Sequence, residues 1–514
     1  MSSRPSTSSP RESIEQHFSL LEKADLEDEP VEDKDGGGNL IQLAAAGSTL
    51  WALQLVWSTI FARGTSYLTY IGIPMSVSAF LWISGPICGM IVQPLMGALS
   101  DSYEPRGSRT GRNKRKPFIL GGAIATAASM IALAWIPNIV VFLEKFLSLG
   151  QEYETLLLIL NATIWVWALS FSVQPLQGGI RTLLHEICSK EAQARFAACQ
   201  GVLVAFGTVS GYFLASVQFG SRPGAWSAIW QFQNLTLVVS LILLLCSAIT
   251  MVCPFRSPRK KVEGAASSSQ YEASLKHAVK RNVNCLRSLP RSIQLTLQVQ
   301  FFSWLGWFPA LYYQTGYLAS LYKVGRAYGL SQPTNEAEHA AADSVPHTIV
   351  MFATAVIMAT MSQWASTSSK RNTFGGKIGS LTTLVIIWAG GHMLFALAMV
   401  ASLFAKAETQ GVWIFALVGI PRALSTWIPY ALIGRKVTES HDAGTLTSLH
   451  NAALSAPQIL AAGLCGFAFM VARYLDVASD DQFRWAMAVA GAAGVGASWR
   501  SWHLLREVRM SLAT

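Results

Sequence analysis

The sequence predicts an all-α integral membrane protein whose chain crosses the bilayer twelve times. Of its 514 residues, 51% are hydrophobic and 13% are charged, whereas roughly a quarter of the residues of a soluble domain are charged. Apolar runs long enough to cross about 30 Å of hydrocarbon recur along the chain. Lysine and arginine gather in the loops between these runs, a distribution that orients membrane helices.

The first 40 residues differ in composition from the rest of the chain. Serines come first, acidic residues follow, and the glycine run Gly36–Gly38 ends the segment. The segment contains no apolar stretch that could build a core or the hydrophobic part of a signal peptide. We therefore expect residues 1–40 to form a disordered acidic tail on the cytoplasmic side.

A basic segment divides the twelve apolar runs into six and six. Residues 254–293 form the predicted cytoplasmic linker between an N-terminal half, 41–253, and a C-terminal half, 294–505. Residues 506–514 are expected to form a short cytoplasmic tail. Paired halves around a central path are typical of secondary transporters. The expected spans are residues 47–70, 76–100, 118–137, 154–176, 196–219, 229–253, 294–320, 345–364, 378–404, 411–434, 446–472 and 482–503.

Charge asymmetry predicts the orientation. Loops after even-numbered spans hold far more basic residues than loops after odd-numbered spans, so both termini are expected in the cytoplasm. Because the basic residues lie between apolar runs, they indicate orientation rather than a nucleic-acid surface, and we expect no nucleic-acid partner. The loop between the second and third spans alone contains Arg106, Arg109, Arg112, Lys114, Arg115 and Lys116.

The same loop carries a pattern that predicts a gate. Gly97 precedes Asp101 by four residues, and Arg112 and Arg115 follow. A glycine lets two helices approach closely, and an aspartate at a helix end can pair with arginines. Inside-positive charge alone would explain the arginines, but not Asp101 and the glycine spacing. The pattern resembles the signature between the second and third helices of the major facilitator superfamily, which implies a latch on the cytoplasmic side.

Eight further motifs occur in order along the chain. They are WALQL at 51–55, GIP at 72–74, GPICGMIVQPLMGALSD at 85–101, GRNKRKPFI at 111–119, QPLQGGIRTLL at 174–184, WLGWFPALYY at 304–313, W-x-P-Y-A-L-I at 427–433 and GTLTSLHNAALSAPQ at 444–458. They resemble the sucrose and alpha-glucoside transporters of the glycoside–pentoside–hexuronide:cation symporter group, and the fungal branch fits better than the plant branch. The resemblance implies a major facilitator fold of six plus six helices and proton-coupled transport of a disaccharide or glucoside.

Positively charged residues inside the spans are the first candidates for substrate contact. Arg181 stands where the family has an arginine after its Q-G-x-x pattern, which here includes Gln177. A guanidinium offers five fixed donors, which suit sugar hydroxyls, a carboxylate or a coupling acid; an anchor at the cytoplasmic boundary is the structural alternative. Arg63 and Arg422 also lie within spans, where a charge needs a cavity or a partner. Aromatic side chains that could stack on a sugar ring include Trp307, Tyr313 and Trp427.

The chain lacks the carboxylates that the resemblance leads us to expect. Ser170 and Ile60 stand where relatives commonly have an aspartate and a glutamate, and no acid occurs at 314–320. His392 and His450 remain as candidate proton carriers, since histidine titrates near neutral pH. The missing acids and the buried arginines also favour an alternative, a carrier of a small anionic organic molecule or secondary metabolite with weak or no proton coupling.

Other function classes find little support in the sequence. No nucleophile–base pair, phosphate loop or metal cluster is recognisable, so we expect no enzyme activity, no cofactor and no metal site. A nutrient sensor would need a long signalling tail, and few residues follow His503. We expect a monomer in the lipid bilayer that binds a small solute and protons. The plasma membrane is the expected location, and a vacuolar or other internal membrane is the alternative.

Overall fold

The computed structural model describes residues 36–102, 115–187, 193–220, 226–253, 289–327, 336–367, 381–437, 443–478 and 481–513. The internal contacts of the chain divide it into residues 1–41 and residues 42–514. Apart from the first residues of α2, 36–41, the helices discussed below belong to the second of these units. In the ranges given, the chain is helical and contains no strand, which confirms the predicted all-α class.

Each of the twelve predicted spans coincides with one helix or with a run of shorter helices. The first span is α2, a π-helical turn η1 and α3, and the second is α4 and α5. The remaining spans are single helices, as the sequence predicts. The bounds are α2 Gly36–Thr59, η1 Ile60–Gly64, α3 Thr65–Tyr70, α4 Met75–Leu81, α5 Ser84–Ser102, α6 Lys116–Ala134, α8 Glu154–Ile187, α9 Gln193–Ser216, α10 Trp226–Val252, α12 Arg291–Ala327, α14 Val345–Thr367, α16 Leu381–Ser402, α17 Glu408–Val437, α18 Ala443–Tyr474 and α19 Gln482–Ala513.

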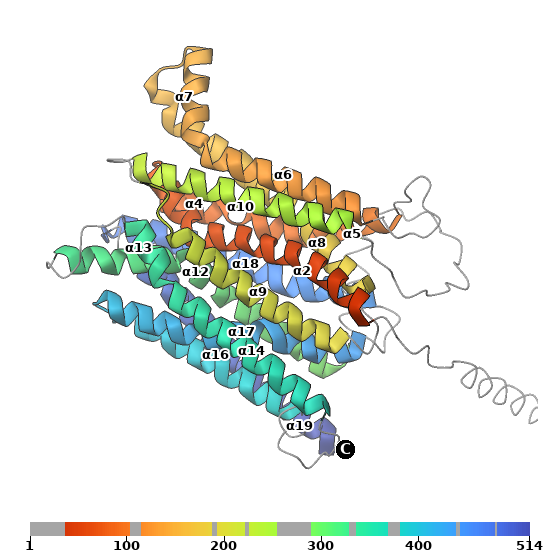
Figure 1. Ribbon diagram of the computed structural model, residues 1–514. Helices are drawn as coiled ribbons and strands as arrows, with labels where there is room; N and C mark the ends of the chain where they lie inside the picture. The colour runs from red at the N-terminus through yellow and green to blue at the C-terminus, as the bar shows by residue number, and fades with distance from the viewer. Residues whose placement is uncertain are drawn as a thin grey trace, which may run out of the picture. The chain divides into compact units, whose positions relative to one another are not determined.

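The long helices lie side by side, and successive spans run in opposite directions (Figure 1). The bundle therefore has two ends. We call the end at which α5 stops and α6 starts the α5–α6 end, and the end at which α3 stops and α4 starts the α3–α4 end. Two shorter helices lie at the α3–α4 end: α7 (Ile136–Leu147), which follows α6, and α13 (Glu336–Asp343), which precedes α14.

Hydropathy agrees with a membrane location. Within the described ranges, eight helical segments are long and apolar enough to cross a bilayer. The apolar part of α9, Gln200–Ser216, is shorter than these segments. Polar residues interrupt the other spans. Because polar side chains are costly in hydrocarbon, they usually face the bundle interior, so they indicate where a solute site can lie.

Parts of the predicted domain division fall outside the described residues. These parts are most of the acidic tail, at 1–35, and most of the linker, at 254–288. At the other end of the chain, α19 continues to Ala513 through the segment predicted as a short tail. The division into two halves and a linker thus stays a prediction.

Small residues allow the helices to approach closely. A Cβ atom at Gly122 of α6 would lie 2.7 Å from the backbone nitrogen of Leu176 in α8. A Cβ atom at Gly419 of α17 would lie 2.4 Å from the carbonyl oxygen of His347 in α14. Any side chain at either position would push the two backbones apart, so these glycines set the helix spacing.

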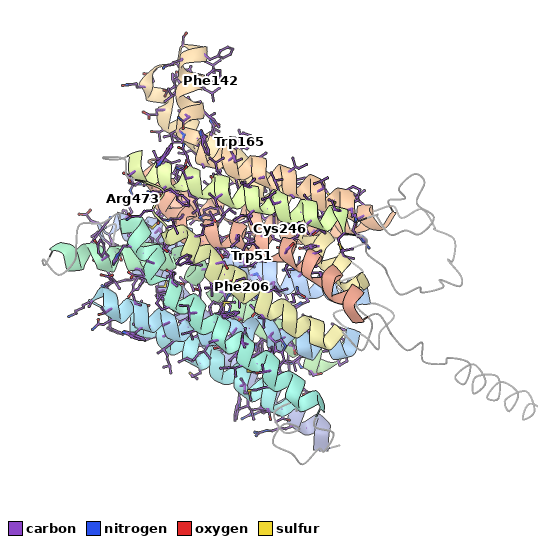
Figure 2. The ribbon with its side chains drawn as sticks, viewed as in Figure 1. Trp51, Phe142, Trp165, Phe206, Cys246 and Arg473 are labelled. Carbon is purple, nitrogen blue, oxygen red and sulfur yellow. The ribbon has the colours of Figure 1, made fainter. Side chains whose placement is uncertain are left out.

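Aromatic contacts fill the wider gaps between helices. Trp51 of α2 stacks on Phe206 of α9 with 6.3 Å between ring centroids (Figure 2). Phe142 on α7, at the α3–α4 end, is 64% exposed (Figure 2). A stack between Phe142 and Phe146, at 5.9 Å, covers part of this apolar surface.

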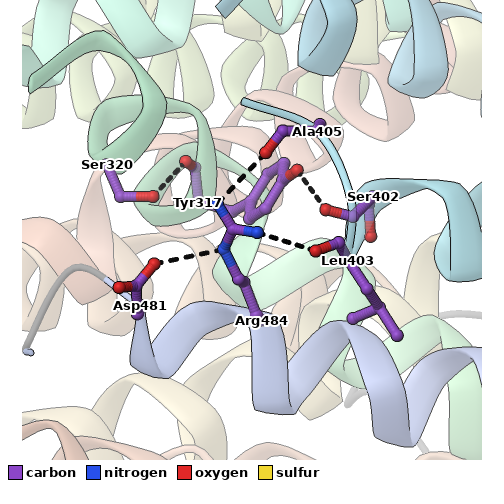
Figure 3. A network of polar contacts seen from close by, with 7 residues as sticks. All are labelled: Tyr317, Ser320, Ser402, Leu403, Ala405, Asp481 and Arg484. Atoms are coloured by element: carbon purple, nitrogen blue, oxygen red, sulfur yellow. Dashed lines mark hydrogen bonds and ion pairs between the residues drawn. The ribbon is translucent and has the colours of Figure 1, made fainter. Parts of the chain in front are cut away.

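A network of hydrogen bonds connects α12, α16 and α19 at the α3–α4 end (Figure 3). Arg484 at the start of α19 donates to the carbonyl oxygens of Leu403, at 2.7 Å, and Ala405, at 3.1 Å. Asp481 holds the guanidinium from the other side, at 3.2 Å. Tyr317 of α12 donates its hydroxyl to the carbonyl of Ser402, at 2.6 Å. The last carbonyl of α16, at Ser402, is thus satisfied by α12, and two carbonyls of the segment that follows α16 are satisfied by α19.

We predict that Arg484→Ala destabilises the bundle. Hydrogen bonds that involve a charged group contribute about 1.5–3 kcal/mol each, so the loss of two such bonds should lower the melting temperature measurably. Thermal unfolding of the purified protein in detergent measures this effect.

Arg473→Ala is the matched control, because Arg473 is exposed near the end of α18 and exposed substitutions usually change stability by about 0.5 kcal/mol or less. Equal melting temperatures for the two variants would contradict the role given to Arg484.

Candidate functional site

Polar side chains from five helices meet between the first six spans and the last six. Four of them are glutamines, and the others are an arginine, a histidine and a tryptophan. Their helices are α2, α5 and α8 from the first six spans and α12 and α18 from the last six. We call the following residues the polar cluster: Trp57, Gln93, Gln174, Gln177, Arg181, Gln300 and His450.

Helix α8 forms the centre of the polar cluster. Trp57 of α2 donates its indole N–H to Oε1 of Gln177 at 3.3 Å. Gln93 of α5 packs against the next residue of α8, with its Cγ 3.7 Å from the position of a Cβ at Gly178. Pro175 lies inside α8, and a proline at this point removes one backbone hydrogen bond of the helix. The polar face of α8 is therefore in contact with both α2 and α5.

Contacts at Gly89 connect the first six spans with α18. Asn451 of α18 donates its side-chain amide to the carbonyl of Gly89 at 2.8 Å. A Cβ at Gly89 would lie 3.2 Å from Oγ of Ser455 and 3.9 Å from Oε1 of Gln174. Gly89 thus lies close to Ser455 of α18 on one side and to the amide of Gln174 on the other.

Arg181, Gln300 and His450 form the part of the cluster nearest the α5–α6 end. Gln300 of α12 and His450 of α18 share a hydrogen bond between their Nε2 atoms, at 3.1 Å. Arg181 of α8 is near enough for its charge to act on His450. The predicted substrate residue Arg181 and the candidate proton carrier His450 are thus brought together, although 269 positions separate them in the sequence.

Several polar atoms of the cluster have no hydrogen-bond partner among the described residues. They are Oε1 of Gln93, Oε1 of Gln174, Oε1 of Gln300 and Nε of Arg181. Gln174 and Gln300 are 2% and 0% exposed, and an unsatisfied buried polar group costs about 1–3 kcal/mol. A solute with several hydroxyl groups would satisfy both kinds of atom, since a hydroxyl donates to an amide oxygen and accepts from a guanidinium.

The predicted residues Arg422 and Trp307 form a second group with other aromatic side chains. The guanidinium of Arg422 in α17 lies 5.1 Å from the ring centroids of both Trp304 and Trp307 in α12. Its charge also acts on Tyr212 of α9 and His347 of α14. Cation–π contacts of this kind stabilise an arginine in an apolar environment, and the Arg422 side chain is only 8% exposed.

Arg63 has a local partner in the backbone of a neighbouring helix. Its Nε and Nη2 atoms donate to the carbonyl oxygen of Ala215, at 3.0 and 2.5 Å. Ala215 lies in the last turn of α9, where carbonyl groups have no partner within the helix. The π-helical turn η1, which contains Arg63, places the guanidinium there. This contact gives Arg63 a structural role at the end of α9.

Two predicted aromatic residues pack into the helix interior. Tyr313 is 0% exposed and contacts Phe469 edge to face at 5.0 Å and Phe483 at 6.5 Å. Trp427 packs against an apolar cluster formed by α12, α16, α17 and α19. In the described part of the chain these two residues therefore pack against apolar side chains rather than against the polar cluster.

The predicted gating residues are described only in part. Asp101 and Gly97 lie in α5, but their side chains are outside the described residues, as is all of Arg112. Arg115 is buried and donates to the hydroxyl of Ser100, which joins the start of α6 to the end of α5. The neighbouring Lys116 donates to the carbonyls of Met251, at 2.5 Å, and Cys253, at 3.0 Å, at the end of α10.

Aromatic and hydroxyl side chains close the path on the α3–α4 side of the cluster. Tyr312 of α12 contacts Phe61 at 5.0 Å and Trp82 at 5.1 Å between ring centroids. Thr65 donates to the carbonyl of Tyr312 at 3.0 Å, and Thr315 donates to the carbonyl of Phe61 at 3.4 Å. These contacts join the first span to the seventh, so a solute in the cluster could not leave in this direction without breaking them.

An apolar groove of about 640 Å³ lies between α5, α6 and α8. Cys88, Trp167 and Phe171 are among the residues that line it. None of its lining residues belongs to the polar cluster, and its lining offers few hydrogen-bonding groups. Phe171 is 50% exposed, which indicates that the groove opens on the outer surface of the bundle, where lipid chains can fill it.

Part of this site was not predicted from the sequence. Gln93, Gln174, Gln300 and Trp57 were not identified, although a glutamine inside an apolar run is a useful signal because its amide needs a partner. The two candidate proton carriers differ in the structure. His392 is hydrogen-bonded to hydroxyls on both sides, Ser501 at 3.0 Å and Ser303 at 3.2 Å, whereas His450 belongs to the polar cluster.

Comparison with known proteins identifies transporters. No protein-family model matches the chain. The chain is 24% identical to the general alpha-glucoside permease of Schizosaccharomyces pombe, over 95% of this chain and 97% of that protein. It is 23% identical to sucrose transport protein SUT2 of Oryza sativa subsp. indica, over 82% of this chain and 85% of that protein. The chain is thus a homologue of these transport proteins, not of enzymes.

Solved structures show the fold. The nucleoside transporter NupG matches with a TM-score of 0.56 at 11% identity, over 90% of this chain and 98% of that one. The proton:xylose symporter XylE of the major facilitator superfamily, bound to 6-bromo-6-deoxy-D-glucose, also matches with a TM-score of 0.56, at 15% identity, over 90% of this chain and 95% of that one. The predicted major facilitator fold is confirmed.

We predict that Gln174→Leu does not lower the melting temperature of the solute-free protein. The substitution removes a buried oxygen that has no partner among the described residues, together with one hydrogen bond from Nε2 to the carbonyl of Ser170 at 3.0 Å. Sites kept for function are often stabilised when an unsatisfied group is replaced, which should offset the lost bond. Thermal unfolding in detergent provides the measurement.

Gln233→Leu is the matched control, because Gln233 is buried and donates to Asn138, at 3.0 Å, and to the carbonyl of Ala134, at 3.3 Å. This control should lose stability. An equal loss in both variants would show that Gln174 has a structural role.

Proposed function

We propose that this protein is a secondary transporter that carries a sucrose- or alpha-glucoside-type sugar by proton symport. The observation that carries the proposal is the polar cluster, in which three amide oxygens and Nε of Arg181 have no partner among the described residues. A disaccharide presents many hydroxyl groups and little charge, which matches these neutral amides. The relatives named above, an alpha-glucoside permease and sucrose transport proteins, support the same class of solute.

Each part of the cluster has a proposed role. Arg181 and the amides of Gln174, Gln177 and Gln300 bind the hydroxyl groups, and Trp57 forms one wall while it orients Gln177 through its indole N–H. A site built to bind hydroxyls discriminates strongly against analogues that lack them, because its buried polar atoms are then left unsatisfied. The atoms that lack partners in the solute-free protein would therefore also select sugars over solutes without hydroxyl groups.

Transport then requires that the cluster opens to each side in turn. The contacts of Tyr312 with Phe61 and Trp82 close the α3–α4 side, and rocking of the two sets of spans would break them. Asp101 with Arg112 and Arg115 is the proposed latch at the α5–α6 end, with Gly97 allowing the close approach. We place this end, and both termini, in the cytoplasm of a plasma-membrane monomer.

His450 is the proposed proton-sensitive group. The positions of the expected acids hold Ser170, which shares a hydrogen bond with Ser84 at 2.8 Å, and Ile60, which is buried in η1. His450 lies beside Arg181 and Gln300, so its charge state would alter both the hydrogen bond to Gln300 and the electrostatic environment of Arg181. A facilitator without coupling is the alternative if His450 does not titrate.

The second candidate function, transport of a small organic anion, rests on Arg422. Its guanidinium lies between two indole rings, which stabilise a cation and leave less of it exposed to a carboxylate. We favour the sugar because the unsatisfied atoms of the polar cluster are mainly acceptors, which would repel a carboxylate.

We predict saturable uptake of radiolabelled sucrose or maltose by proteoliposomes that contain the purified protein. Arg181→Ala should lower uptake at low sugar concentration by roughly ten- to hundredfold, the effect of losing hydrogen bonds to a charged group. Arg473→Ala is the control and should transport normally. Saturable uptake of a carboxylate that Arg422→Ala abolishes, without any sugar uptake, would support the anion carrier instead.

We predict that His450→Gln uncouples sugar uptake from the pH gradient. A glutamine retains hydrogen-bonding capacity toward Gln300 but cannot titrate, so sugar should still equilibrate without accumulating against its gradient. Uptake with and without an imposed pH gradient measures this, and His392→Gln serves as the control. If wild-type uptake also ignores the gradient, the protein is a facilitator.

A further inference from the structure

Three side chains with metal-binding chemistry come together at the α3–α4 end, away from the polar cluster. His339 and Asp343 lie on α13, and Glu408 is the first residue of α17. One ligand atom from each lies within 4.8 Å of the other two. Sixty-nine positions separate His339 from Glu408, so the spacing of residues in the sequence did not indicate a site here.

We propose that His339, Asp343 and Glu408 bind a divalent transition-metal ion of the Zn²⁺ class. One imidazole and two carboxylates are a ligand set that Zn²⁺ commonly takes, with water completing a tetrahedron. His339 and Asp343 are four residues apart on α13, which places both side chains on one face of the helix. Glu408 approaches that face from a second helix.

The distances between the ligand atoms lie on either side of the value expected around a tetrahedral metal ion. Nε2 of His339 lies 2.5 Å from Oε1 of Glu408 and 3.8 Å from Oδ2 of Asp343. Around a tetrahedral zinc ion the ligand atoms are about 3.4 Å apart, given bonds of about 2.0–2.2 Å. Small side-chain rotations would bring both pairs to this separation, and the α13 and α17 backbones need not move.

Two further observations distinguish this group from an ordinary ion pair. Oδ2 of Asp343 is buried and receives no hydrogen bond from the described residues, and Nε2 of His339 lies 3.8 Å from it. The ring of His339 lies against the ring of Tyr322 from α12, with 4.3 Å between centroids and an angle of 35°. Tyr322 is 1% exposed, so this packing restricts the orientation of the imidazole.

A metal ion at this site would connect α13 to α17. Helix α13 belongs to the last six spans but also contacts α9 and η1 of the first six. A metal held by α13 and α17 would fix α13 to the last six spans at the end where Tyr312 and Phe61 close the path. The side chains of His339, Asp343 and Glu408 are 35%, 15% and 19% exposed, so an ion can reach them.

Thermal unfolding of the full-length protein, first freed of metal with a chelator, tests the proposal. Addition of ZnCl₂ should raise the melting temperature of the wild type in a concentration-dependent way, because a ligand that binds only the folded state stabilises it. MgCl₂ should cause no comparable rise, since Mg²⁺ demands octahedral oxygen coordination. No rise with ZnCl₂ would overturn the proposal.

Variants assign the effect to the three residues. His339→Ala should abolish the rise, and Glu408→Gln should raise the zinc concentration that it requires at least tenfold. His503→Ala, which removes a partly exposed histidine on α19, should keep the rise. His339→Gln is the second variant if His339→Ala does not fold. Visible absorption of bound Co²⁺ reports coordination independently of stability, and an unchanged zinc shift or Co²⁺ spectrum in the His339 variants would overturn the proposal.

Discussion

The scarcity of hydrogen-bonding solvent inside a bilayer is the constraint on which the rest of the structure depends. Every polar group that a span carries needs a partner from the chain, from a solute or from a local water. Arg63 and Arg484 meet this demand with carbonyl oxygens at the ends of α9 and α16. Arg422 meets part of it with two indole rings. Several atoms of the polar cluster have no partner among the described residues, and these are the atoms that we propose a solute satisfies.

The twelve spans could be predicted from the sequence because hydropathy and loop charge act locally. A run of about twenty apolar residues is a helix wherever it lies in a membrane, so even the interrupted first and seventh spans were found. The π-helical turn at Ile60–Gly64 and the separate helix α13 were not predicted. Both depend on contacts with distant helices, such as the packing of Gly64 against Trp82 and of α13 against α9, which no local pattern encodes.

The site could be predicted only where a motif or a charge drew attention to a residue. Arg181 and Gln177 were found through the family pattern, and both belong to the polar cluster. Gln174 and Gln300 are ordinary amides in sequence, and their importance appears only when α8 and α12 are placed in space. Arg63 and Arg422 were correctly expected to need partners, but which partner each has depends on tertiary structure.

A structure of the protein determined by electron cryo-microscopy with sucrose or maltose at saturating concentration tests the central claim most directly. The account predicts density for one sugar in contact with Gln174, Gln177, Arg181 and Gln300, on the α5–α6 side of Tyr312. The same map without sugar should lack this density. Sugar density beside Arg422, Trp304 and Trp307, with the polar cluster empty, would contradict the account.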